Sequence, residues 1–143
     1  MSMLISALIC VALLAVSFAH LLWSFGVNWP TKDEKLLART VTGFANAERM
    51  PPRWMSFGVA VLTFAAAVWA LALADHDGGG VLLTLIGAAL GLVFLARGII
   101  GFTPGWAQKT PEEPFRTNDR RVYSPLCIAL GVGFLVLVLM RLL

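Results

Sequence analysis

The stretch GVLLTLIGAALGLVFLARGIIGF, residues 80–102, decides the fold, because it carries a single charged side chain over a length that can cross a bilayer. A transmembrane helix needs about 20 mostly apolar residues. Three more such runs lie at about residues 3–27, 54–74 and 123–143. Lipid cannot satisfy open backbone donors and acceptors, so each run is expected to be a helix. The sequence therefore predicts an all-α integral membrane four-helix bundle, with residues 1–143 forming a single domain.

The composition also indicates a membrane protein. Hydrophobic residues make up 59% of the chain and charged residues only 13%, against roughly 25% charged in soluble domains. The first run has no Lys or Arg before it and is too long for a typical signal core, so we expect an uncleaved helix. Cys10 and Cys127 fall in different spans and form no metal-ligand cluster. No metal-binding or cofactor-binding motif occurs, so we expect neither a metal nor a cofactor.

Positive charge gathers on one side of the predicted bundle. Four spans place loops 28–53 and 103–122 on one side, and both termini with the turn 75–77 on the other. The two loops hold Lys32, Lys35, Arg39, Arg49, Arg53, Lys109, Arg116, Arg120 and Arg121. Short cytoplasmic loops collect such residues, which predicts a multi-pass protein of the cell membrane with cytoplasmic loops and both termini outside. Contact with anionic membrane lipids explains this charge without nucleic acid.

The first long loop is expected to hold a short amphipathic helix at the membrane interface. TKDE, residues 31–34, matches the S/T-x-x-E capping box, in which the threonine caps the helix. Leu37, Val41 and Phe44 then recur at helical spacing. The second loop has several prolines and mixed charge, and it is expected to be an irregular cap.

Polar and aromatic side chains gather near the predicted cytoplasmic side, and all four spans contribute. The residues concerned are His20, Trp23, Ser24, Trp54, Phe94, Arg97, Tyr123 and Cys127. His20, Trp23 and Ser24 share one helix face, because they lie at i, i+3 and i+4. Gly87 and Gly91 form a G-x-x-x-G pair that allows a neighbouring helix to approach closely. Close packing below a wider polar end predicts a vestibule for a molecule with a polar head and a lipophilic tail.

These residues also have structural explanations, which stay open at this point. Tryptophan concentrates at membrane interfaces whatever the function, and Arg97 can extend its guanidinium to the headgroups. An imidazole cannot reach so far, so His20 is expected to face the bundle and bind a partner. That partner is either a neighbouring helix or a ligand.

Three stretches resemble a bacterial family of small four-span membrane proteins, the domain of unknown function family 3995. They are HLLWSFGVNWP at residues 20–30, RGIIGF at 97–102 and FRTNDRRVYSPLCIALG at 115–131. The resemblance extends over nearly the whole chain, and its most specific part is YSPLC at 123–127. It implies a four-helix fold with the same clustering of polar positions, and it brings no catalytic residue.

The clustered residues favour a membrane protein that binds a lipophilic small molecule, with cofactor-independent isomerase or cyclase chemistry on an isoprenoid-like substrate. His20 exchanges protons near neutral pH and is the candidate general acid–base group. Arg97 is the candidate to bind an anionic head or stabilise developing negative charge. Tyr123 is a candidate proton donor, and Asp119 or Glu48 is a candidate to orient His20 or act as an acid.

The candidate ligand-binding residues are Trp23, Ser24, Trp54, Phe94 and Cys127. Indole rings attract a cationic intermediate by about 0.5–2 kcal/mol per contact. A non-catalytic accessory or assembly subunit of a larger membrane complex is the alternative, and it predicts that the glycines matter more than His20. A small transporter fits less well, because the bilayer centre is almost wholly apolar. Expected partners are membrane lipids, a lipophilic molecule, and either a homo-oligomer or a larger membrane complex.

Overall fold

The computed structural model describes residues 1–143 and contains helices with no strand. Its four long helices are α1 (Ser2–Ser24), α3 (Arg53–Ala74), α4 (Gly80–Ile100) and α7 (Ser124–Leu142). All four are long and apolar enough to cross a membrane, α7 together with the helical segment before it. The predicted all-α, four-span architecture is confirmed, and the chain is a multi-pass membrane protein.

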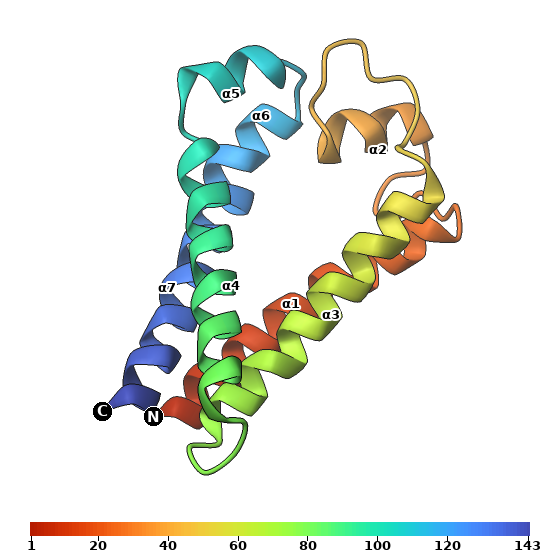
Figure 1. Ribbon diagram of the computed structural model, residues 1–143. Coiled ribbons are helices and arrows are strands. Elements are labelled where there is room, and N and C mark those ends of the chain that lie inside the picture. The colour runs from red at the N-terminus through yellow and green to blue at the C-terminus, as the bar shows by residue number, and fades with distance from the viewer.

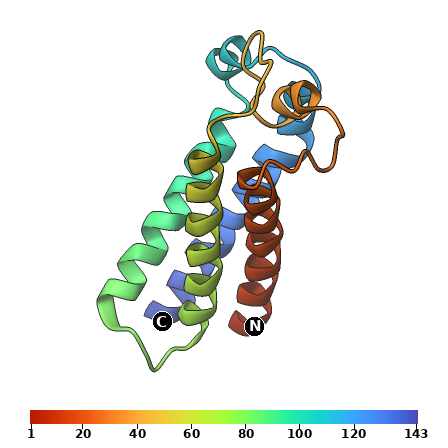
Figure 2. The ribbon, with the colours of Figure 1, turned by 90° about the vertical axis from the view of Figure 1, so that its right-hand side faces the viewer.

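The long helices form two antiparallel pairs that diverge like the arms of a V (Figure 1). We call α1 with α3 the first hairpin, and α4 with α7 the second hairpin. Both chain termini and the α3–α4 turn lie where the arms meet, which we call the terminal end (Figures 1 and 2). The remaining short helices lie at the opposite, loop end.

The two hairpins share a core only in the half nearer the terminal end. Leu13, Leu73, Phe134 and Leu137 are fully buried there, and the ring of Phe94 stacks on Phe134 at 5.9 Å between centroids. Four alanines of α3 are buried, namely Ala60, Ala66, Ala67 and Ala70, and the Ala60 carbonyl accepts a hydrogen bond from the Ser17 hydroxyl of α1 at 2.7 Å. This core holds the arms together at one end and leaves the loop end to other contacts.

The second hairpin packs through glycines on both of its helices. A Cβ atom at Gly98 would lie 2.8 Å from the Ser124 carbonyl oxygen, and one at Gly131 would lie 2.8 Å from the Gly91 carbonyl oxygen. Gly87 similarly faces Leu73 of α3. The predicted G-x-x-x-G pair therefore faces neighbouring helices, because a side chain at Gly87 or Gly91 would push them apart.

The last span begins earlier than residue 123. Helix α6 (Phe115–Asn118), a π-helical turn η1 (Asp119–Tyr123) and α7 run on without a break. Pro125 has no N–H and its ring would clash with the carbonyl four residues earlier. The wider π turn just before it accommodates the proline without ending the helix, and it places Asp119 inside the bundle.

The short helix of the first loop is α2 (Glu34–Val41), close to the predicted position. The predicted cap is wrong: the side chain of Asp33, rather than Thr31, accepts a hydrogen bond from the Lys35 N–H at 3.2 Å. The second loop was expected to be irregular, yet it contains α5 (Pro104–Lys109) as well as α6. Thr103 caps α5, and Pro104 suits the first helical turn, where no N–H is needed.

Contacts between the two loops join the hairpins across the loop end. The Tyr123 hydroxyl donates to the Thr40 carbonyl at 3.3 Å. Arg39 lies 3.6 Å from Glu112, whose carboxylate also accepts from the Asn46 N–H at 3.0 Å. The space between the diverging arms is thus bounded by α2 on one side and by α6 on the other (Figure 1).

Candidate functional site: two cavities on the first hairpin

His20 lies on α1 near the loop end with one ring nitrogen unused. Its Nδ1 is 2.9 Å from the Val16 carbonyl oxygen. A carbonyl only accepts, so Nδ1 carries the proton and donates, and Nε2 of the neutral ring is an acceptor. No group of the protein hydrogen-bonds to Nε2. The Trp23 ring packs beside the imidazole, with centroids 4.6 Å apart.

The imidazole lines a cavity of about 170 Å³, which we call the inner cavity. It lies between α1, the end of α2 and the beginning of α3, and most of its lining is apolar. The side chains that bound it are those of His20, Trp23, Val41, Thr42, Met50, Pro51, Met55, Ser56 and Val59. The Thr42 hydroxyl is bound to the Ala38 carbonyl at 2.7 Å. His20 Nε2 and the Ser56 hydroxyl are therefore the polar groups left for an occupant.

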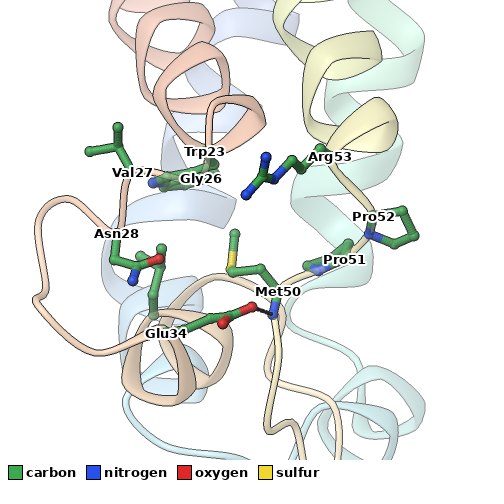
Figure 3. Close-up of a pocket in the computed structure, with 10 residues that line it drawn as sticks. Trp23, Gly26, Val27, Asn28, Glu34, Met50, Pro51, Pro52 and Arg53 are labelled. Carbon is green, nitrogen blue, oxygen red and sulfur yellow. Dashed lines mark hydrogen bonds between the residues drawn. The ribbon is translucent and has the colours of Figure 1, made fainter.

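A second cavity of about 270 Å³, the outer cavity, adjoins the first toward the aqueous side. Figure 3 shows the Arg53 guanidinium pointing into it from the start of α3, with Glu34 on the far side. Glu34 Oε1 accepts from the Met50 N–H at 3.2 Å. Trp23, Met50 and Pro51 line both cavities and form their common wall.

The loop end of the second hairpin is organised differently, around a carboxylate that is only 2% exposed. Asp119 Oδ1 accepts from Arg97 Nη2 at 2.7 Å and from the Ser124 hydroxyl at 3.1 Å. Asp119 Oδ2 accepts from Trp106 Nε1 at 2.9 Å. The Arg97 guanidinium also lies over the Trp106 ring, 5.0 Å from its centroid. We call these four residues the Asp119 network, and every member has a partner within it.

The structure does not gather the sequence-predicted site residues into one vestibule. His20 and Trp23 line the inner cavity, whereas Arg97, Asp119, Tyr123 and Cys127 lie on the second hairpin. Arg97 is bound to Asp119, so it neither extends to the headgroups nor meets His20. Cys127 is a half-buried free thiol.

The other four predicted residues lie outside both cavities or make only local contacts. The Ser24 hydroxyl donates to the Leu21 carbonyl of its own helix at 2.6 Å. Trp54 is 73% exposed, and Phe94 stacks in the shared core. Glu48 pairs with Lys35 at 3.3 Å on the surface.

Sequence reasoning missed Arg53, Glu34, Asn28 and Ser56, which line the two cavities. Arg53 stood out only as one of nine loop cations, and nothing in its sequence neighbourhood separates it from the others. Its distinguishing feature is a position opposite residues 26–34, which only the folded loop creates. No three His, Cys, Asp or Glu side chains meet in a way that would hold a metal ion.

Comparison with known proteins identifies the family. The family model described as a protein of unknown function, DUF3995, matches residues 13–134, and the chain belongs to this family. No curated protein and no solved structure matches the chain. The matched range includes both cavities and the Asp119 network.

Proposed function

We propose that the protein binds a lipophilic small molecule in the inner cavity, within the membrane at the loop end. The observation that carries this proposal is the unused Nε2 of His20, which faces an apolar cavity bounded by three helices. The free Nε2 of a neutral imidazole is a hydrogen-bond acceptor. A ligand with a hydrogen-bond donor would satisfy the nitrogen while its apolar part fills the remaining volume.

The same nitrogen can support acid–base chemistry. Neutral Nε2 can take a proton from a carbon acid of the substrate and return it to another carbon, which is an isomerisation that needs no cofactor. The Trp23 ring beside it would attract a cationic intermediate of an isoprenoid-like substrate. We therefore propose a cofactor-independent isomerase or cyclase as the catalytic form of this function.

We place the loop end in the cytoplasm and both termini outside. The support is the gathering of Lys and Arg in the two long loops, which the positive-inside tendency associates with the cytoplasmic face. The ligand would then enter from the inner leaflet.

A non-catalytic binding or accessory subunit is the second candidate, and the Asp119 network favours it. Arg97 and Asp119, the groups expected to assist His20, are bound to one another. Catalysis would thus depend on His20 and the Ser56 hydroxyl, with no carboxylate beside them.

The first experiment is mass spectrometry of lipophilic molecules that co-purify with the gently solubilised protein, comparing wild type, His20→Ala and His76→Ala. His76 is an exposed histidine in the α3–α4 turn, so its substitution is a matched control. We expect one compound in the wild type and in His76→Ala, and its loss or reduction in His20→Ala. The same bulk phospholipid in all three samples would overturn the proposed binding site.

Catalysis is tested separately with the bound compound in deuterated water. An isomerase that uses His20 incorporates solvent deuterium into the compound in the wild type and at a rate at least about a hundredfold lower in His20→Ala. Binding without incorporation would exclude the acid–base mechanism and leave the non-catalytic role.

A further inference from the structure

The outer cavity contains two side chains of opposite charge that do not pair with each other. Arg53 makes no hydrogen bond or ion pair with any group of the protein, so all five of its N–H donors are free for a ligand. Glu34 uses Oε1 to accept from Met50, and Oε2 has no partner. The guanidinium points into the space between them (Figure 3).

The position of Arg53 is unfavourable for the helix that carries it. It is the first residue of α3, where the helix dipole is positive and disfavours a cation. Gly26 has φ +80°, and a Cβ there would lie 2.6 Å from Arg53 Nη2, so the loop leaves room for the guanidinium. Arg53 is exposed, so water screens part of this repulsion, and a bound anion would relieve the rest.

The two cavities suit the two halves of one amphiphile. Ordinary small-molecule pockets have volumes of roughly 300–1,000 Å³. Neither cavity reaches that range alone, at about 270 and 170 Å³, but the two together do. Because Trp23, Met50 and Pro51 line both, the two cavities lie side by side, and a molecule that lies across these residues can place its head in the polar space and its tail in the apolar one.

We propose that the outer cavity binds the phosphate group of an amphiphile whose hydrocarbon part occupies the inner cavity, an assignment that rests on the proposed function. Arg53 forms the paired, charge-assisted hydrogen bonds that a guanidinium makes with phosphate oxygens. Glu34 Oε2 accepts from a hydroxyl or amino group of the head, or from a protonated phosphate oxygen. The amphiphile is either a phosphorylated lipophilic metabolite or a membrane phospholipid.

The test measures binding by native mass spectrometry of the detergent-solubilised full-length protein. The probes are farnesyl phosphate, farnesol, dioleoylphosphatidylethanolamine and inorganic phosphate. Three variants accompany the wild type. Arg53→Gln removes the charge, and Arg121→Gln is the matched control, because Arg121 is an exposed, unpaired arginine before α7 that lines neither cavity. Val59→Phe fills the inner cavity without touching the outer one.

We expect the wild type to bind farnesyl phosphate at least about tenfold more tightly than farnesol. Arg53→Gln should abolish this preference while it still binds farnesol, and Arg121→Gln should keep the preference. Val59→Phe should weaken the binding of both farnesyl phosphate and farnesol. Equal or tighter, Arg53-dependent binding of dioleoylphosphatidylethanolamine supports the headgroup site and identifies a membrane phospholipid as the source.

Four outcomes would overturn the inference. The phosphate site is contradicted if the wild type binds farnesyl phosphate and farnesol equally. It is also contradicted if Arg53→Gln keeps the preference for farnesyl phosphate. In either case, loss of farnesol binding in Val59→Phe would still support the proposed function, which is binding in the inner cavity. If inorganic phosphate binds as tightly as farnesyl phosphate, the hydrocarbon part contributes nothing to binding, and the site is not one for an amphiphile. Absence of saturable binding by every amphiphile contradicts the proposed function itself.

Discussion

The two hairpins use their polar residues in opposite ways at the same end of the molecule. In the second hairpin, Arg97, Asp119, Ser124 and Trp106 bind one another, and a nearly inaccessible carboxylate accepts three hydrogen bonds. In the first hairpin, His20 Nε2 and the Arg53 guanidinium have no partner and face cavities. Satisfied groups stabilise a fold, whereas unsatisfied groups beside a cavity are available to a ligand. The comparison assigns a structural role to the Asp119 network and binding to the two cavities of the first hairpin.

The largest expected effect is the difference between two arginine substitutions. Arg97→Ala leaves Asp119 buried without its cation, and breaking a buried pair in this way costs about 3–5 kcal/mol. Arg53→Ala removes an exposed, unpaired side chain, so its cost should stay within about 0.5 kcal/mol. Unfolding by SDS titration in mixed micelles measures both. Equal losses of stability in Arg97→Ala and Arg53→Ala would contradict the proposed difference between the hairpins.

The next effect concerns the glycine seam of the second hairpin. Gly98→Ala places a Cβ 2.8 Å from the Ser124 carbonyl, and overpacking of this kind costs about 1–3 kcal/mol. Gly58→Ala on α3 is the control, because a Cβ there meets no atom within 4 Å. It should be neutral or stabilise the helix by up to about 1 kcal/mol. The same unfolding assay applies, and a neutral Gly98→Ala would show that α4 and α7 are less closely packed.

A smaller effect tests how the first hairpin is held together. The Ser17 hydroxyl donates to the Ala60 carbonyl of α3 at 2.7 Å, and interhelical hydrogen bonds in membranes contribute about 0.6 kcal/mol on average. Ser17→Ala should therefore lower the free energy of unfolding by about 0.5–1.5 kcal/mol. In Thr63→Ala the lost bonds run only to carbonyls of the same helix, and little change is expected. A larger loss in Thr63→Ala would contradict this account.

The smallest expected effect is at His20. Its one hydrogen bond runs to Val16 of its own helix, so His20→Gln should change the free energy of unfolding by less than about 0.5 kcal/mol. Loss of the ligand from such a variant then reports on the cavity and not on folding. Marked destabilisation would instead assign His20 a structural role, as for the polar residues of the Asp119 network.

Sequence alone determined the class of the fold and its approximate spans. Long apolar runs can only be helices in lipid, because the backbone must satisfy its own hydrogen bonds. The family resemblance and the amphipathic helix α2 were also readable from local patterns. Local patterning was less informative for residues 103–122, where α5 depends on the Thr103 cap and α6 continues into the last span.

The tertiary structure alone decided which polar groups meet. Arg97 and Asp119 are 22 residues apart, and the π turn before Pro125 is what carries the carboxylate into the bundle. Arg53 and Gly26 come together because the end of α1 packs beside the start of α3. Hydropathy and spacing report the depth of a residue in the membrane and its face on its own helix. They do not report the divergence of two hairpins, and that divergence separates His20 from Arg97.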